Sequence, residues 1–192
     1  ALGGDEYRYV LRDRTTAGVI ADVRDGASEL GVLVQTSASK KELDAAFDEA
    51  GLEFVPCAES DPMVALPASH PLSNASSLKL DDLADWPYLY FEQEPDAAAA
   101  FAEEALSDVK RAKTIGCTDR ATLSELASAV NGYTVTSGIL VGITDGGSLT
   151  TIPLESDVKL SLGYVVKKDG ELSAAAERFV ANLKRALERY AL

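Results

Sequence analysis

The sequence predicts an α/β protein in which strands and helices alternate along most of the chain. Two observations support this fold class: apolar residues recur at helical spacing in several segments, and short apolar runs typical of strands lie between those segments. Of the 192 residues, 46% are hydrophobic and 26% are charged, which suffices for one large or two small domains with an apolar core. The order strand, helix, strand indicates a sheet with crossover helices.

The N-terminal part of the chain shows this alternation most clearly. Residues 6–12 alternate with period two and are rich in Tyr and Val, which predicts a strand, and the continuous apolar run at 29–35 is of the buried parallel-strand type. Helices are predicted between and after them, at 14–26 with Thr15 or Thr16 as N-cap, and at 40–51. Further strands are expected at 52–58 and 61–68.

A stretch rich in proline and serine, 68–77, is the candidate linker or domain crossing, and a second series of elements follows it. Helices are predicted at 78–86, 96–108, 119–132 and 172–190. Strands are predicted at 88–93, 113–118, 133–138, 149–155 and 159–168, with a turn at 145–147.

Composition and charge exclude several classes of protein. The net charge of −13 repels phosphate backbones, so these residues alone should not bind DNA, although plain solubility explains the acidity equally well. Cys57 and Cys117 lie far apart and His70 is the single histidine, so we expect no disulfide framework, no metal site and no cofactor. No apolar stretch is long enough to span a membrane and residues 1–10 lack a signal-peptide pattern, so a cytoplasmic protein is expected.

Four segments resemble, in the right order, the effector-binding domain of LysR-type transcriptional regulators. DPMVALPASHPL followed by LKLDDLADWPYLYF is similar to the family's strand ending in Leu-Pro, its His-Pro-Leu and its short helix before an apolar strand. TTAGVIADVRDGASELGVLV resembles an earlier helix, turn and strand of the family. DRATLSELASAVNGYTVTSG and LSLGYVVKKDGELSAAAERFVANL resemble the later helix–strand unit and the closing strand and helix.

The resemblance implies a type 2 periplasmic-binding-protein-like fold, with two α/β subdomains joined by two crossing strands and the ligand between them. Subdomain I would comprise residues 1–67 and 158–192, and subdomain II residues 68–157, with crossings near 66–68 and 154–158. The family's winged helix-turn-helix has no counterpart in the sequence. The first strand of the effector domain, and most of the helix that follows it, also have none.

The function that the resemblance implies is the sensing of a small organic effector, with a carboxylate among the candidates. Binding would control transcription through an appended DNA-binding domain, in a full-length protein that forms homodimers. A solute-binding protein of a transporter with the same fold is the alternative, and it would carry a signal peptide or a lipidated cysteine. We expect no enzymatic activity and assign no catalytic residue, because no GxSxG, Walker or GxGxxG motif occurs.

Candidate effector-binding residues lie where strands end and helices begin, because unsatisfied backbone N–H groups there suit anions. Thr15 and Thr16 open the first predicted helix, and the resemblance places a ligand-contacting hydroxyl near Thr16; a simple N-cap explains them equally well. The other candidates follow later strands and comprise Gln35, Thr36, Ser37, Phe91, Glu92, Gln93, Thr118, Arg120, Thr136, Ser137 and Gly138.

Each of these later candidates has a purely structural alternative. Gln35 and its two neighbours would otherwise form an ordinary polar loop. Phe91 suits an organic ligand by its apolar ring, yet a core position for Phe91 and a solvated Glu92 are equally compatible with the pattern. Arg120 suits a ligand carboxylate, or one of the many surface acids. Gly138 allows close backbone approach or a plain turn.

Overall fold

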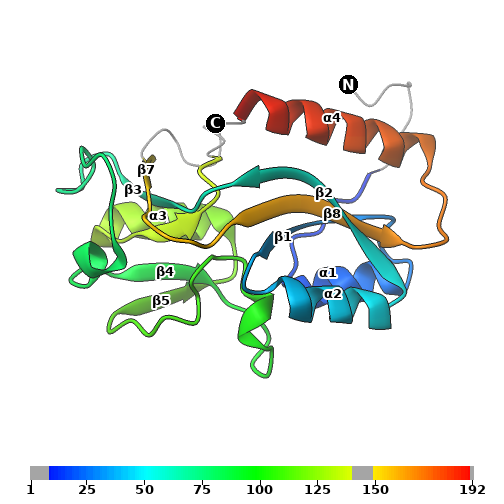
Figure 1. Cartoon of the computed structure of the whole chain (residues 1–192), viewed down its shortest axis with the longest axis horizontal. Coiled ribbons are helices and arrows are strands. Elements are labelled where there is room, and N and C mark those ends of the chain that lie inside the picture. Colours follow the sequence, from blue (N-terminus) through cyan, green and yellow to red (C-terminus); the bar gives the residue numbers. More distant parts are fainter. Residues whose placement is uncertain (1–8, 140–148, 191–192) are drawn as a thin grey trace.

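The computed structural model describes residues 9–139 and 149–190, and it is built around two sheets. In the first sheet, β8 (Leu160–Lys167) lies between β1 (Gly31–Thr36) and β2 (Leu52–Ser60) and is antiparallel to both. Helices α1 (Thr16–Arg24) and α2 (Lys40–Glu49) lie on one side of this sheet, and α4 (Ala174–Tyr190) lies on the other (Figure 1).

The second sheet is centred on β3 (Met63–Pro67), which pairs antiparallel with β6 (Thr134–Thr136) and with β7 (Leu149–Pro153). A parallel pair, β4 (Tyr88–Phe91) and β5 (Thr114–Cys117), joins it through a bridge between Tyr88 and Tyr133. Helix α3 (Arg120–Val130) packs against β3, β4 and β5.

The chain crosses between the two sheets twice. It leaves the first sheet after Ser60 and enters β3 at Met63, and it returns between Pro153 and Leu160. The division into subdomains at 67/68 and 157/158 stays a prediction; β3, which it assigns to subdomain I, hydrogen-bonds to β6 and β7.

Four apolar clusters hold the described elements together, and the two largest fix the sheets. One lies between α1, α2 and the first sheet and includes Val23, Phe47 and Val165. The other connects the two sheets, because Leu160 of β8 packs in the same cluster as Val64 and Ile152 of the second sheet. The α/β class is therefore confirmed, and each sheet is fixed by burial of its apolar face.

Helix boundaries follow from local sequence signals. Thr15 caps α1 by accepting a hydrogen bond from the backbone of Gly18, and Asp119 caps α3 through Thr122 N. Gly26 and Gly51 follow the ends of α1 and α2 at φ of +76° and +69°, a conformation that glycine adopts at no steric cost. The helices predicted at 14–26, 40–51, 119–132 and 172–190 are confirmed.

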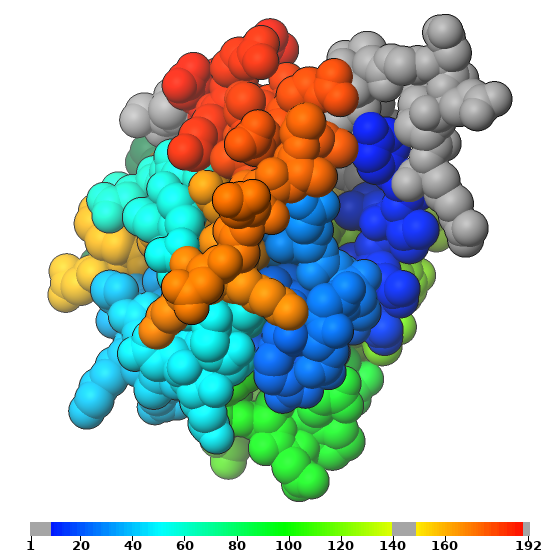
Figure 2. Space-filling model, turned by 90° about the vertical axis from the view of Figure 1, so that its right-hand side faces the viewer, coloured from blue at the N-terminus to red at the C-terminus, as the bar shows by residue number. Residues whose placement is uncertain are grey.

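The predicted strand at 6–12 is wrong for the residues that the structure describes. Residues 9–12 have no regular secondary structure, and residues 6–8 lie outside the described part of the chain. In Figure 2 the dark blue start of the described chain runs along the outside of the molecule, and Leu11 is 93% exposed. No neighbouring strand pairs with these residues in the described ranges, so their alternating pattern has no sheet to join.

The predicted parallel pairing of the run at 29–35 is also wrong, because β1 pairs antiparallel with β8. The reason is that a strand 120 or more residues later in the sequence inserts beside β1, which periodicity cannot reveal. The other edge of β1 has no hydrogen-bonded strand among the described residues, and Val32 is 46% exposed there.

We call β1, β2 and β8 with α1, α2 and α4 the first unit, and β3 to β7 with α3 the second unit. Two helices predicted within the second unit are wrong. Residues 78–86 contain only a 3₁₀ turn at Leu80–Leu83, and residues 96–108 contain only one at Ala99–Phe101. Alanine-rich composition favours a helix at 96–108, but tertiary packing overrides it: Glu104 turns inward, Ala105 is fully buried and Leu106 has a φ of +60°. The turn predicted at 145–147 lies outside the described residues.

Substitution of Gly163, in the middle of β8, tests how closely β2 packs against this strand. A Cβ at position 163 would collide with the backbone oxygen of Val55 and stand 2.6 Å from Cζ of Phe54. We expect Gly163→Ala to lower the free energy of unfolding by ~1–3 kcal/mol in urea titrations. Gly170→Ala, at an exposed position after β8 where a Cβ would stand 3.1 Å from Cβ of Lys167, is the control and should have a clearly smaller effect. Equal effects of the two substitutions would contradict the central position of β8.

Candidate functional site

The N-terminus of α1 meets a loop from the second unit. The backbone N–H of Thr16 donates a hydrogen bond to Oε1 of Gln93 at 3.2 Å. The hydroxyl of Thr15 donates to Oε1 of Glu94 at 3.4 Å. Gln93 and Glu94 directly follow β4, whereas Thr15 and Thr16 directly precede or open α1. Thr16 and Gln93, two predicted effector-binding residues 77 positions apart in the sequence, are thus brought into contact at the boundary between the two units.

The carboxamide of Gln93 takes the place at α1 that an anion or another acceptor would take. The first N–H groups of a helix have no intrahelical partner and carry partial positive charge. Thr16 is 3% exposed, so its N–H depends on a protein or ligand acceptor. Nε2 of Gln93 is buried and has no hydrogen-bond partner within the described ranges. The carboxamide of Gln93 therefore has a partner for its oxygen but, among the described residues, none for its nitrogen.

A second group of side chains surrounds the start of α3. Arg120 Nη2 pairs with Oε2 of Glu103 at 3.1 Å, and its Cζ lies 4.5 Å from the ring centroid of Phe91. Burial raises the pKa of Glu103, Arg120 opposes that shift, and the nearby charge of Asp13 adds to it. Phe91 and Arg120 are thus brought together, whereas Glu92 and Thr118 are exposed.

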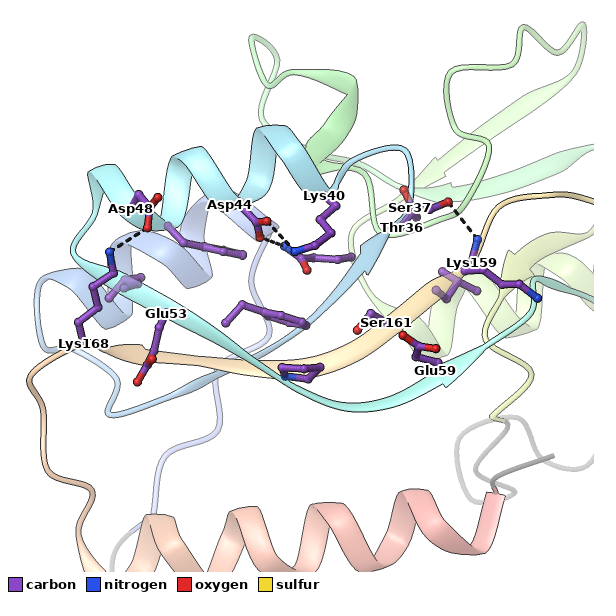
Figure 3. Close-up of a pocket in the computed structure, with 16 residues that line it drawn as sticks. Thr36, Ser37, Lys40, Asp44, Asp48, Glu53, Glu59, Lys159, Ser161 and Lys168 are labelled. Atoms are coloured by element: carbon purple, nitrogen blue, oxygen red, sulfur yellow. Dashed lines mark hydrogen bonds and ion pairs between the residues drawn. The ribbon is translucent and has the colours of Figure 1, made fainter.

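The end of β1 forms a separate polar cluster. Gln35 donates from Nε2 to Asp44 at 2.7 Å, and Thr36 and Ser39 exchange backbone and hydroxyl hydrogen bonds. Ser37 Oγ accepts from the backbone N–H of Lys159 at 3.1 Å. The cluster borders a cavity of about 530 Å³ between α2 and the strands β2 and β8 (Figure 3).

This cavity is edged by side chains of both charges. Figure 3 shows the ion pairs on the α2 side, in which Lys40 contacts Asp44 at 2.6 Å and Lys168 contacts Asp48 at 2.8 Å. Because these lysines are already paired and exposed, the cavity offers no unpaired cation from them to an anionic ligand. It lies on the α2 side of the sheet and has neither Thr16 nor Gln93 in its wall.

The remaining predicted residues lie at the end of β6 (Thr134–Thr136) and directly after it. Thr136 is in register with Met63 across the β3–β6 pair, and Ser137 and Gly138 follow it. Gly138 has a φ of +82°, and a Cβ there would stand 2.7 Å from Cγ of Met63. A glycine is therefore required at this position by both backbone conformation and close packing.

Glu104 is a buried carboxylate that sequence reasoning missed. Glu103 and Glu104 lie within the helix predicted at 96–108, yet Glu104 is 5% exposed and its Oε1 accepts from the backbone N–H of Phe91 at 2.8 Å. Burial raises the pKa of Glu104 to about 7, and the hydrogen bond from Phe91 opposes that shift. The sequence signal for burial of Glu104 is weak and consists only of the apolar residues on either side of Glu103 and Glu104.

The surroundings of His70 and of the two cysteines indicate a structural role for these residues. His70 is 2% exposed, packs edge-on against Trp86 at 4.2 Å between ring centroids, and accepts from the backbone N–H of Leu72 at 3.1 Å through Nδ1. Burial lowers its pKa. Cys57 and Cys117 are free thiols on β2 and β5, and burial raises the pKa of each.

Two kinds of feature are absent from the residues that the structure describes, a metal-binding cluster and a membrane-spanning helix. Residues 9–139 and 149–190 hold no group of three or more His, Cys, Asp or Glu side chains placed to bind a metal ion. None of the helices in those ranges is long and apolar enough to cross a membrane.

Comparison with known proteins assigns the family. Residues 6–188 match the LysR substrate binding domain, so the chain belongs to this family. The fold is the type 2 periplasmic-binding-protein-like fold, and the class of protein is the effector-sensing domain of a transcription regulator. No match to this sequence is found among the curated proteins.

Solved structures share the fold at low sequence identity. The effector binding domain of QuiR in complex with shikimate is 17% identical, with a TM-score of 0.62 over 93% of this chain and 80% of that one. HinK, a LysR family transcriptional regulator from Pseudomonas aeruginosa, is also 17% identical, with a TM-score of 0.60 over 91% of this chain and 58% of that one. The C-terminal domain of a probable LysR family transcriptional regulator from Rhodococcus sp. RHA1 is 17% identical, with a TM-score of 0.59 over 88% of this chain and 80% of that one.

The raised pKa of Glu104 makes a testable contribution to stability. Between pH 4.5 and about 7 the folded protein keeps a proton on Glu104 that the unfolded chain releases, so this contribution is lost as pH rises. We expect the difference in unfolding free energy between wild type and Glu104→Gln to change by up to about 3 kcal/mol across that range, in favour of the variant at higher pH. A difference that is independent of pH would contradict the buried position of Glu104.

Proposed function

We propose that the effector binds at the N-terminus of α1, between the first sheet and the loop after β4. The observation that carries this proposal is the hydrogen bond from Thr16 N–H to Oε1 of Gln93, which spans the two units. An effector oxygen that replaces the Gln93 carboxamide would gain the same N–H donor. Phe91 ends β4 just before this loop, and Arg120, which opens α3, lies over its ring, so the two supply an apolar ring and a cation.

The chemistry of this site favours a carboxylate. A helix N-terminus attracts negative charge, and a carboxylate accepts more strongly than the neutral amide that now lies there. Arg120 is exposed and pairs at 3.1 Å with the half-buried carboxylate of Glu103, so a ligand carboxylate competes with that one carboxylate for the guanidinium. The complex of the QuiR domain with shikimate, a carboxylate, supports this choice for the present chain.

Release of Gln93 provides the route from binding to regulation. The hydrogen bonds of Thr15 and Thr16 to Gln93 and Glu94 connect elements of different sheets, so their exchange for ligand contacts alters how the two units meet. In the full-length regulator this change would reach an appended DNA-binding domain within a homodimer in the cytoplasm. The net charge of −13 supports DNA contact through that other domain and not through this one.

A ligand screen followed by substitutions of Gln93 tests the proposal. Thermal-shift measurements against small carboxylates, shikimate included, should give a hit, since a ligand at 100 times its Kd adds roughly 2.7 kcal/mol of stability. Gln93→Ala removes the competing acceptor and should tighten binding of that hit by roughly two- to tenfold, the worth of one net hydrogen bond. Gln93→Glu places a carboxylate at the same atoms and should weaken binding by a similar factor.

Ser173→Ala is the matched control for effects on folding. The Ser173 hydroxyl accepts from the backbone N–H of Ala176 at the start of α4, so its loss removes a helix cap on the other side of the first sheet. It should cost about 1 kcal/mol of stability and leave the affinity for the carboxylate unchanged. Equal affinities for wild type, Gln93→Ala and Gln93→Glu would place the effector elsewhere.

A further inference from the structure

Residues 99–106 connect the two units through side chains at either end, and we call this segment the strap. At its start the turn Ala99–Phe101 contacts α2, and Phe101 packs against the apolar cluster between α1, α2 and the first sheet. Near its end Glu104 and Ala105 are buried in the second unit, with exposed fractions of 5% and 0%. The strap therefore spans the boundary between the units.

Little regular structure holds the strap in place. Its only helical element is the three-residue 3₁₀ turn at Ala99–Phe101. Leu106 has a φ of +60°, a left-handed conformation that is costly for a residue with a Cβ. The position of the strap therefore depends on the side chains that it buries, and such segments open more readily than the sheets beside them.

The buried carboxyl of Glu104 has one hydrogen bond and no ion pair. Its Oε1 accepts from the backbone N–H of Phe91 at 2.8 Å, whereas Oε2 is buried without a partner among the described residues. In the same ranges no lysine or arginine forms an ion pair with it. Burial of a neutral carboxyl costs far less than burial of an unpaired anion. The closed strap therefore favours the protonated form of Glu104.

The groups that surround Glu104 do not compensate its charge. Glu103, in the strap itself, repels an anion at position 104, and Arg120 of α3 attracts it but already pairs with Glu103 at 3.1 Å. Burial is the largest effect and raises the pKa of Glu104 to about 7. The other titratable or charged groups on this side of the second unit are Tyr88 on β4, Cys117 on β5, and Arg111, which stacks on Tyr88 and donates to Tyr133 and to backbone carbonyls.

We propose that the strap is a pH-sensitive connection between the two units, closed while Glu104 is protonated and released when Glu104 is ionised. An ionised Glu104 reaches water by turning away from β4, which breaks its hydrogen bond with the backbone of Phe91 and withdraws Ala105 from the apolar cluster. Phe101 then loses the anchor that keeps it against the first unit. This proposal does not depend on where the effector binds.

Release of the strap also reaches two candidate effector residues, a consequence that rests on the proposed function. Glu103 moves with Glu104 and leaves Arg120, whose Cζ lies 4.5 Å from the ring centroid of Phe91. The guanidinium of Arg120 is then free to pair with a ligand carboxylate.

The proton on Glu104 determines the pH range in which the strap opens. Below pH 4.5 the closed and the open strap both carry this proton, so the opening equilibrium does not depend on pH. Between pH 4.5 and about 7 only the closed strap retains it, and the opening constant rises roughly tenfold per pH unit. Above this range both forms are ionised and the constant levels off.

Amide hydrogen exchange of the ¹⁵N-labelled chain between about pH 5 and 8 tests the proposal. The amide of Phe91 is the reporter, because Glu104 accepts its hydrogen bond. Corrected for the intrinsic exchange rate, its protection should fall roughly tenfold per pH unit up to about pH 7 and then level off. Val165, fully buried in the central strand β8, should stay more strongly protected at every pH, because its exchange requires the first sheet to unfold.

Three variants separate the strap from other effects of pH. Glu104→Gln keeps the size of the side chain and an acceptor for Phe91 but does not titrate, so the protection of Phe91 should become independent of pH. Glu125→Gln, exposed on α3, is the matched control and should retain the wild-type dependence. Phe101→Ala removes the anchor on the first unit, so it should lower the protection of Phe91 at every pH and keep its dependence on pH.

Four outcomes would overturn the proposal. The first is protection of Phe91 that does not change with pH in the wild type, and the second is an equal pH dependence in Glu104→Gln. Equal protection of Phe91 and Val165 would mean that Glu104 is released only when the whole protein unfolds. Unchanged protection of Phe91 in Phe101→Ala would show that the strap does not connect the units.

Discussion

The central position of β8 is the constraint on which the rest of the structure depends. β1 and β2 do not pair with each other, and each hydrogen-bonds to β8 between them. The same strand carries Leu160 into the core that joins the two sheets. Because the chain crosses between the sheets just before β8, the strand fixes both the first sheet and the path by which the second sheet connects to it.

This arrangement bears on the proposed effector site. The start of α1 and the loop after β4 belong to different sheets, and hydrogen bonds from Thr15 and Thr16 connect them. These bonds are few and involve side chains that a ligand can replace, whereas the shared core around Leu160 is extensive and apolar. If the effector binds as proposed, an exchangeable connection would stand beside a permanent one, which is the property that a sensor of small molecules requires.

Local sequence signals predicted the elements whose stability is local. The helices after Thr15 and Asp119 follow their caps, and α4 follows its periodic apolar positions. The prediction of a helix at 96–108 is wrong because the inward turn of Glu104, and not the helix propensity of the alanines, sets the conformation of this segment. Thr16 and Gln93 could be proposed singly, but their contact depends on the packing of two sheets, and no pattern within either segment encodes it.

The position of β8 also sets the order in which the protein can fold during synthesis. The strands β3, β4, β5, β6 and β7 are all present once Pro153 has been added, so the second unit can begin to assemble on the ribosome. β1 and β2 must wait for Leu160–Lys167 before either has a partner. Within this chain, the sheet whose first strands come earlier in the sequence is therefore the one completed later.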